Sequence, residues 1–288
     1  INISLNDDFE RSRIQLLNAV QELIQSRNIS KLYESIILDE AQDYLPDEIQ
    51  LFSKLCKRMF VVADTRQKIY HGTDSINTIQ SIVEKTHTLR FHYRNGLKIC
   101  RLADGIAKES EDYQPLASTS NYDEHKTPST VEVIRTKTLE EQCNIILERI
   151  KVQLKAYPNE HIGIITPRRE ELSNLSQFFM QTDLYSDDLL QVREDGSECF
   201  DHNRPIILTT LHSAKGLEFR ALHIAALDCV KRFHKQRNMC FTAVTRAKTA
   251  LYVYHTKELP GYFEQAYADM QRPPALPKIE DLFTKEAK

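Results

Sequence analysis

Apolar and polar positions along the chain follow two distinct periods. Short continuous apolar runs, typical of buried strands, are separated by longer stretches in which apolar residues recur every three or four positions, as on one face of a helix. Strands that are apolar throughout and alternate with amphipathic helices are characteristic of parallel sheets covered on both faces. The pattern therefore predicts an α/β fold built on parallel sheets.

The first part of the chain contains three predicted strands among helices. The strands are predicted at 35–38, at 58–64 ("RMFVVAD") and at 86–91 ("THTLRF"), and a helix over 95–108 closes this part. A second helix is expected to begin at Pro46, because proline favours the first helical turn. The first helix has its apolar face at Leu16, Leu17, Val20, Leu23 and Ile24. The strands at 35–38 and 58–64 are expected to be buried.

Residues 110–130, "SEDYQPLASTSNYDEHKTPST", differ from the rest because they are polar and contain Pro, Ser and Thr, which predicts a linker or a long surface loop. The alternation then resumes, with strands expected at 131–136, 161–166, 206–212, 221–227 and 251–255 and helices at 139–157, 170–181 and 236–248. We therefore expect two α/β domains in series. They cover residues 1–110 and 131–270, with a linker at 111–130 and a Pro-rich, disordered or docking tail at 271–288.

Composition narrows the class of protein. A chain of 288 residues with 41% hydrophobic content can bury the cores of two domains. It has no apolar run of roughly 18 residues and no charged-then-apolar leader, which favours a cytoplasmic location. The six cysteines lie far apart without a C-x-x-C pair, so buried free thiols are expected rather than a zinc site. The net charge of −3 implies that any contact with nucleic acid is local.

Acidic side chains follow the first predicted strand in "SIILDEAQD". In open parallel sheets ligands bind at the carboxyl ends of strands, so Asp39, Glu40 and Asp43 are candidates for a site. An aspartate in this place can hold Mg²⁺ through water, and an adjacent glutamate can take a proton from an attacking water. On its own, however, the pair is explained equally well by a strand that ends in a polar turn.

Five short motifs occur in order along the chain: "DEAQD" (39–43), "ADTRQKIY" (63–70), "LRFHYRN" (89–95), "TLHSAKGLEF" (210–219) and "AVTRAK" (243–248). Together they resemble motifs II to VI of the UvrD/Rep-type superfamily 1 DNA helicases, over residues 36 to 255. The most specific matches are "TLHSAKGLEF" and "TRAK". The resemblance implies two RecA-like parallel-sheet lobes, the first truncated at its N-terminus, and a motor that uses ATP and Mg²⁺.

The resemblance assigns the chemistry of ATP hydrolysis to five residues. It implies that Asp39 holds Mg²⁺ and that Glu40 is the base that activates water. Gln67 resembles the family's nucleotide sensor. Arg94 and Arg246 resemble the arginines that meet the γ-phosphate from two sides of an interdomain cleft, where a permanent charge and fork geometry suit phosphate. Without the motifs, Gln67 and both arginines would be interpreted as ordinary surface side chains.

Three further residues are assigned to the nucleotide by the same resemblance. Tyr93 resembles the ring that stacks on adenine, Glu218 resembles the group that approaches the ribose, and Gln42 lies within the motif that carries the two acids. Outside the motif, Tyr93 would be interpreted as a core tyrosine.

For DNA, Thr210 and His212 resemble groups that meet the backbone, and Tyr70 is expected to contact a single strand. The family usually carries a tryptophan two positions after Tyr70 that stacks on a base. This chain has Gly72 there and contains no tryptophan, and His71 offers only a weak substitute.

A phosphate-cradling loop of the type G-x-x-x-x-G-K-[S/T] is missing from the sequence, in which no Gly is followed by Lys. In the family this loop precedes the D-E motif, and residue 1 is isoleucine rather than methionine. We therefore expect the loop upstream of Ile1 and interpret the chain as the C-terminal part of a larger motor.

The main hypothesis is an ATP-dependent single-stranded DNA translocase or helicase. Its expected partners are single-stranded DNA, the missing N-terminal segment of the same polypeptide and a further protein such as a nuclease. The alternative is a nucleotide-gated DNA-binding or regulatory module of a nuclease or defence assembly, without unwinding, which the lost tryptophan favours. A third hypothesis, a structural α/β protein with chance motifs, would require five motifs to fall in order by accident. Strand displacement by the full-length protein would separate the first two.

Overall fold

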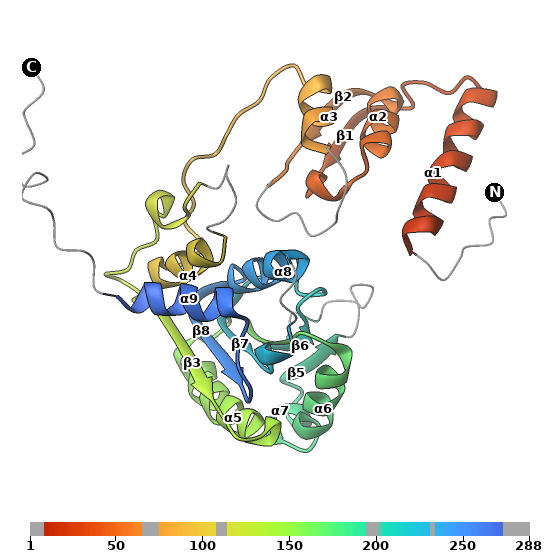
Figure 1. Ribbon diagram of the computed structural model, residues 1–288. Coiled ribbons are helices and arrows are strands. Elements are labelled where there is room, and N and C mark those ends of the chain that lie inside the picture. The colour runs from red at the N-terminus through yellow and green to blue at the C-terminus, as the bar shows by residue number, and fades with distance from the viewer. Residues whose placement is uncertain are drawn as a thin grey trace, which may run out of the picture. The chain divides into compact units, whose positions relative to one another are not determined.

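The computed structural model describes residues 9–64, 75–107, 114–193, 201, 203–230 and 234–272 (Figure 1). The chain divides into two compact units, Ile1–Leu89 and Arg90–Lys288. Each unit contains a sheet, one of two strands and one of six, and all the described strand pairings are parallel. The predicted class, α/β with parallel sheets, is therefore confirmed.

The first unit is a small sheet with helices on one face. Its elements are α1 (Phe9–Ser26), β1 (Tyr33–Leu38), the 3-10 helix η1 (Ala41–Asp43), α2 (Pro46–Leu55), β2 (Cys56–Val61) and α3 (Ser75–Ile82). Leu38, Ile49 and Ile79 form the core between the sheet and its helices, and Ile36 and Met59 pack against them. On α1, Arg13 pairs with Glu48 and also donates to the Asp43 carbonyl at 3.0 Å. This arginine ties α1 to α2 and η1.

The opposite face of the two-stranded sheet is exposed. Ile37 and Phe60 are partners in the parallel register, and their side chains remain 73% and 64% exposed. Side chains alternate between the two faces of a strand, so each strand has one covered and one open side. The prediction that both strands are buried is therefore wrong, because helices cover only the side of Ile36 and Leu38.

The strand predicted at 86–91 does not form. These residues have no regular secondary structure, and only His92, just beyond them, makes an isolated parallel β-bridge, with Ser120. Leu89 is 92% exposed, and Phe91 is exposed as well. A strand needs a neighbour to accept its backbone hydrogen bonds, and in this segment only the His92 position has one.

The second unit contains a six-stranded sheet in the order β3-β8-β7-β4-β6-β5. Its strands are β3 (Thr130–Arg135), β4 (Ile162–Thr166), β5 (Leu190–Arg193), β6 (Ile206–Thr210), β7 (Phe219–Ile224) and β8 (Ala247–His255). Its helices are α4 (Leu97–Ala107), α5 (Leu139–Ala156), α6 (Arg169–Phe179), α7 (Asp183–Ser186), α8 (His234–Val244) and α9 (Gly261–Gln271), with the short 3-10 helices η3 (Ala117–Thr119) and η4 (Leu227–Cys229). The strands and helices predicted for this region are confirmed, whereas β5, α7 and α9 were not predicted.

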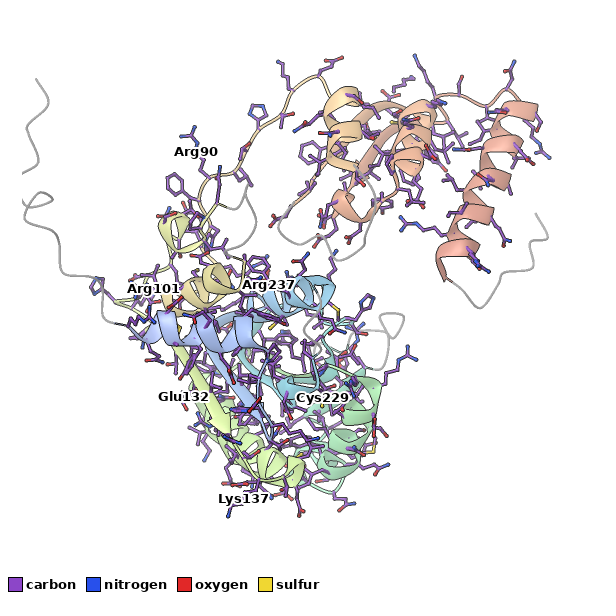
Figure 2. All side chains as sticks on the ribbon, viewed as in Figure 1. Arg90, Arg101, Glu132, Lys137, Cys229 and Arg237 are labelled. Carbon is purple, nitrogen blue, oxygen red and sulfur yellow. The ribbon has the colours of Figure 1, made fainter. Side chains whose placement is uncertain are left out.

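Helices cover both faces of this sheet, with α5 and α6 on one side and α4, α8 and α9 on the other (Figure 1). Figure 2 shows side chains filling the space between the layers. Along β6, Ile206 and Leu208 belong to the core on the α5 side, and Ile207 belongs to the core on the α4 side. A strand whose side chains alternate between two buried faces is apolar throughout, so the strands of this sheet could be predicted from apolar runs in the sequence.

Helix α4 belongs to the second unit. A Cβ atom added at Gly105 would lie 2.7 Å from the Cβ of Ala266, so glycine allows α4 and α9 to pack closely. Ile99 and Leu102 of α4 are fully buried in the same core as Phe263 of α9. The boundary expected at residue 110 therefore moves to Leu89/Arg90.

The described part of the predicted linker, from residue 114, is fastened to the second unit by side-chain hydrogen bonds. Asp104 of α4 accepts from the backbone N–H of Leu116 at 2.7 Å and of Ala117 at 3.0 Å. Glu124 accepts from the N–H of Leu97, the first residue of α4, at 2.5 Å. This segment is therefore a packed loop, and the Pro-rich tail lies outside the described residues from 273 onward.

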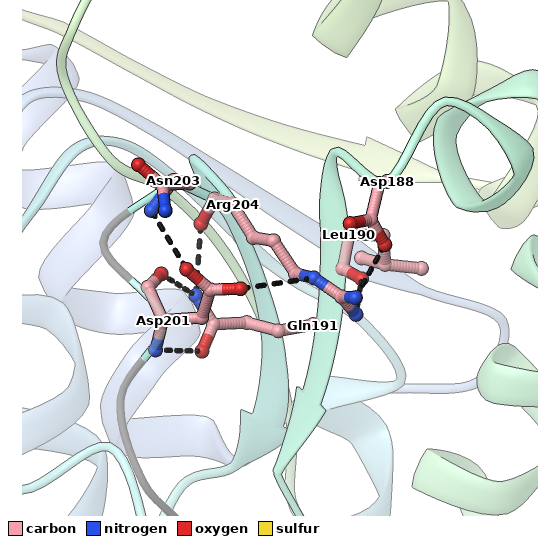
Figure 3. Close-up of polar contacts among 6 residues, drawn as sticks. All are labelled: Asp188, Leu190, Gln191, Asp201, Asn203 and Arg204. Atoms are coloured by element: carbon pink, nitrogen blue, oxygen red, sulfur yellow. Dashed lines mark hydrogen bonds and ion pairs between the residues drawn. The ribbon is translucent and has the colours of Figure 1, made fainter.

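Polar side chains hold the start of β6 against the outer strand β5 (Figure 3). Buried Gln191 donates to the carbonyls of Asp201 and Arg204, both at 2.8 Å. Arg204 pairs with Asp188 and lies 3.2 Å from Asp201. These contacts brace the edge of the sheet.

All the described cysteines are free thiols, and four of the five are buried. Burial raises the pKa of Cys100 and Cys143 to about 12, and burial followed by the effect of Glu171 raises the pKa of Cys229 to about 11. The expectation of buried free thiols is confirmed for Cys56, Cys100, Cys143 and Cys240, whereas Cys229 is partly exposed and Cys199 lies outside the described residues.

Candidate nucleotide and nucleic-acid sites

Three motifs of the second unit meet at the amino ends of β7 and β8. The side-chain amide of Asn95 donates to the carbonyls of Thr245 at 2.8 Å and Ala247 at 2.6 Å. The Gly96 N–H donates to the Lys248 carbonyl at 2.8 Å, and the Phe219 N–H donates to the Arg246 carbonyl at 2.9 Å. Segments far apart in the sequence, "HYRN", "KGLEF" and "TRAK", are thereby joined into one layer.

Two glycines at the edges of these motifs are required by the local backbone. A side chain at Gly96 would collide with the Cβ of Ser129, so only glycine fits between α4 and the loop before β3. Gly216 has a φ of 84°, in the left-handed region that favours glycine, and it turns the chain toward Glu218. Local backbone constraints therefore explain why Gly96 and Gly216 are glycines.

Glu218 joins the charges of this layer. Its carboxylate pairs with the Arg94 guanidinium through one oxygen and lies 3.1 Å from the Lys248 ammonium through the other. All three side chains are partly exposed, so the cluster stands at the surface. Two cations share one carboxylate, which leaves positive charge available to an incoming anion. Sequence reasoning did not single out Lys248.

Arg246 lies beneath that surface. Its side chain is 2% exposed, and its guanidinium donates to the carbonyls of Thr242 at 3.1 Å and Leu217 at 3.5 Å. These bonds hold α8 and the "KGLEF" segment together. The predicted γ-phosphate contact of Arg246 thus requires its guanidinium to become accessible.

In the first unit, Asp39 and Glu40 follow β1 as predicted. Glu40 has a left-handed backbone (φ 51°) and caps η1, and its N–H donates to the Asp39 carboxylate at 2.9 Å. Gln42, which is 1% exposed, donates to the Glu40 carboxylate and accepts from the Asp64 N–H at 2.9 Å. Gln42 therefore positions Glu40 and bridges the ends of β1 and β2, a role that the sequence did not reveal.

The predicted Mg²⁺ ligand can be tested against these contacts. Asp39 is exposed, and its carboxylate accepts a hydrogen bond from the N–H of the next residue, Glu40. Such a carboxylate suits a cation that is held mainly by water and phosphate. Within the described residues no group of three or more His, Cys, Asp or Glu side chains could hold a metal by itself. The donor set fits Mg²⁺ that arrives with a nucleotide.

A second candidate site lies at the carboxyl ends of β4 and β6. A pocket of about 220 Å³ is lined by Pro167, Arg168, Arg169, Thr210, His212 and Ser213. Arg168 and Arg169 are exposed at the start of α6, and Arg168 donates to the Cys229 carbonyl at 3.0 Å. His212 is exposed as well. The pocket therefore presents cationic and neutral donors at the sheet edge where ligands of parallel sheets bind.

Thr210 has a local structural role, and its predicted contact with the DNA backbone stays a prediction. It is almost fully buried, and its hydroxyl accepts from the Ser213 N–H at 3.2 Å and donates to the Ser213 hydroxyl at 3.1 Å. It shapes the turn that carries His212. The two arginines were missed, although the basic pair directly after the strand "HIGIIT" in "TPRRE" is a signal that could have found them.

Several predicted site residues are not brought together by the structure. Gln67 and Tyr70 lie outside the described residues, so their assignments stay predictions. Glu40 belongs to the first unit and Arg246 to the second, so their predicted approach across a cleft also stays a prediction. Tyr93 is 71% exposed and is therefore not a core tyrosine.

Comparison with protein families finds one match, within the second unit. Residues 205–254 match the family model described as the UvrD-like helicase C-terminal domain. This stretch holds β6, β7, α8 and nearly all of β8, and with them "TLHSAKGLEF" and "AVTRAK". The match confirms the resemblance to UvrD-like helicases over residues 205–254.

No curated protein matches the chain. Similar solved structures include the C-terminal domain of a possible DNA helicase from Lactobacillus plantarum WCFS1, at 15% identity and a TM-score of 0.45, over 62% of this chain and 96% of that one. The PRRSV helicase is similar at 17% identity and a TM-score of 0.40, over 78% of this chain and 37% of its own. Arterivirus nonstructural protein 10, a helicase solved with DNA, is similar at 16% identity and a TM-score of 0.41. The similarity covers 78% of this chain and 40% of the arterivirus chain. The chain thus spans less than half of either viral helicase chain.

None of the described helices is long and apolar enough to cross a membrane.

Proposed function

We propose that this chain is the C-terminal motor portion of an ATP-dependent single-stranded DNA translocase or helicase. The observation that carries the proposal is the hydrogen-bonded layer in which Asn95, Gly96 and Phe219 join three motifs around Arg94, Glu218 and Lys248. Chance motifs have no reason to converge in space, because they lie up to about 150 positions apart in the sequence. The convergence supports a common ligand at this surface.

That ligand is proposed to be the phosphate end of ATP. Arg94 and Lys248 provide fixed positive charge, and ATP would compete with the Glu218 carboxylate for both. In the first unit, Asp39 is proposed to hold Mg²⁺ and Glu40 to activate water, with Gln42 holding Glu40 in place. When bound, Mg²⁺ would supply charge neutralisation on the phosphates through Asp39.

Single-stranded DNA is proposed to bind at the Arg168–Arg169–His212 pocket. Phosphates suit this pocket because guanidinium and imidazole groups donate to phosphate oxygens, and the first N–H groups of α6 add a partial positive charge. The net charge of −3 offers no general attraction for a polyanion, so the local pocket must supply the affinity.

Titration of a labelled single-stranded oligonucleotide at several salt concentrations tests this part of the proposal. Affinity should fall as salt rises, because each phosphate contact releases counterions. Arg169→Ala should weaken binding and reduce the slope of log affinity against log salt by about 0.7, the value for one lost contact to a single strand.

Arg101→Ala is the matched control, since Arg101 is also an exposed arginine of the second unit and lies on α4 (Figure 2). The control should keep the full salt slope. An equal loss in both variants would assign binding to net charge rather than to the pocket. Equal affinity for duplex DNA would also contradict the proposal.

A further inference from the structure

Two aromatic side chains stand exposed beside the charged layer. Phe91 and Tyr93 are 60% and 71% exposed, occupy alternate positions of the segment that leads into α4, and lie between Arg90 and Arg94. Arg90 extends from this segment (Figure 2). Single exposed apolar residues are common in proteins, whereas a spaced aromatic pair flanked by arginines has the composition of a stacking site.

The residue between them is fixed by hydrogen bonds. The His92 N–H donates to the Thr119 carbonyl at 3.1 Å, the His92 carbonyl accepts from Asn121 at 2.8 Å, and its Nε2 lies 2.9 Å from the Leu116 carbonyl. His92 thus faces the 116–121 segment with its backbone and its ring. Side chains alternate along an extended chain, so Phe91 and Tyr93 project to the opposite side.

The spacing of the pair suits a flat ring between them. Two residues of extended chain advance by about 6.7 Å. Stacked bases in DNA are spaced by about 3.4 Å, so a ring between two others needs roughly twice that distance. Because hydrogen bonds fix the backbone at His92, the positions from which Phe91 and Tyr93 extend are set before any ligand arrives, which lowers the entropy lost on binding.

We propose that Phe91 and Tyr93 hold a purine base between them, with Phe91 covering the face that Tyr93 leaves open. This inference rests on the proposed function, in which Arg94, the next residue, meets the phosphates of the same nucleotide. It adds Phe91 to the site and adds a preference for purines, because a two-ring base covers more of both aromatic faces than a one-ring base.

The absence of tryptophan from the chain provides a direct reporter. Phe91→Trp introduces a single indole, which can be excited at wavelengths where nucleotides do not absorb. ATP and GTP should quench its emission, UTP should quench it less, and inorganic triphosphate should leave it unchanged. Equal effects of triphosphate and ATP would overturn the proposal, since they would show a response to phosphate rather than stacking.

Affinity measurements on variants without the tryptophan show whether binding needs an aromatic ring at residue 91 or only an apolar side chain of similar size. Phe91→Leu should weaken ATP binding about tenfold, within the range for loss of one stacked ring, whereas Phe91→Tyr should retain it. Phe60→Leu is the matched control, because Phe60 is equally exposed on β2 and should not affect binding. Phe91 is largely exposed, so these variants should fold as the parent does.

The outcomes distinguish this inference from the function on which it rests. If Tyr93→Ala weakens ATP binding and Phe91→Leu does not, the inference fails and the proposed function stands. If the unaltered chain binds no ATP at any concentration, both fail. If a single-stranded oligonucleotide quenches Phe91→Trp and saturating ATP does not displace it, the pair belongs to the DNA strand and the inference is overturned.

Discussion

At the scale of single residues, the second unit contains a neutral histidine at its centre. His223 is fully buried, its Nε2 lies 2.8 Å from Gln153 Oε1 and its Nδ1 lies 3.0 Å from the Tyr254 hydroxyl. The rings of Tyr252 and Tyr254 stack beside it. Burial, with a smaller contribution from Arg149, lowers the pKa of His223 to about 3. The imidazole is therefore a packed hydrogen-bonding group rather than a proton carrier.

This histidine should make stability depend on pH. Its folded-state pKa lies below the unfolded value of about 6.5, so between pH 6.5 and 3 the unfolded chain binds more protons than the folded one. Its contribution is complete above about pH 6.5 and should fall by about 1.4 kcal/mol per pH unit below it. Urea unfolding of the parent and of His223→Asn at several pH values measures this difference. In the variant, the slope of unfolding free energy against pH below about pH 6.5 should be smaller by the equivalent of one bound proton.

His125→Asn is the matched control, because His125 is exposed in the same unit. It should keep the parent's slope. An unchanged slope in His223→Asn would show that the buried imidazole accepts a proton without opening the fold.

At the scale of elements, the two-stranded sheet of the first unit places two adjacent isoleucines on opposite faces, one covered and one exposed. Ile36 packs against the core of the unit, and Ile37, the next residue of β1, is exposed on the open face. Their side chains have the same composition, so burial alone should decide what each contributes to stability.

The adjacent pair allows a direct test. Ile36→Ala should cost about 2 kcal/mol of unfolding free energy, the low end for truncating an isoleucine, because Ile36 is only partly buried. Ile37→Ala should change it by less than about 0.5 kcal/mol. Denaturant unfolding of both variants measures the difference. A comparable loss in Ile37→Ala would show that the open face is covered in solution.

The strands and helices also show which parts of the fold could be predicted from the sequence. Apolar runs correctly predicted five of the six strands of the larger sheet, all except β5, because both of its faces are buried. The segment "THTLRF" was also predicted to be a strand, which does not form, and its two apolar residues, Leu89 and Phe91, are exposed. Helical periodicity located α4 but could not show that it packs on α9, because a repeat identifies a buried face without identifying what covers it.

The candidate sites divide in a similar way. Motifs located Arg94 and Glu218, which the structure joins, but not Lys248, which shares the same carboxylate. Arg168 and Arg169 lie outside every motif, and their role depends on two strands separated in the sequence that end side by side. Such neighbours follow from sheet order, which a single sequence does not specify.

At the scale of the whole molecule, the proposed nucleotide turnover would require a group that binds the β-phosphate. A G-x-x-x-x-G-K-[S/T] loop, a common group of this kind, does not occur in the 288 residues. Stabilisation of the transition state comes from the full set of groups, and the acids and arginines are only some of them.

The chain by itself should therefore bind ATP weakly and release no phosphate above background. Phosphate release with Mg²⁺, with and without single-stranded DNA, measures this, and Glu40→Gln serves as the control that lacks the proposed base but keeps its shape. Robust turnover by the parent that Glu40→Gln abolishes would show that hydrolysis does not require the phosphate loop. Turnover that survives in Glu40→Gln would point to a contaminating enzyme.

The stretch between β6 and β7 covers only residues 211–218, yet it leads from the carboxyl end of one strand to the amino end of another in the same parallel sheet. His212, in the pocket, and Glu218, bound to Arg94 and Lys248, stand near its two ends. This short connection is a direct covalent link between the two candidate sites. If nucleotide and DNA bind as proposed, thermodynamic linkage makes any influence mutual: the factor by which nucleotide changes the affinity for DNA equals the factor by which DNA changes the affinity for nucleotide.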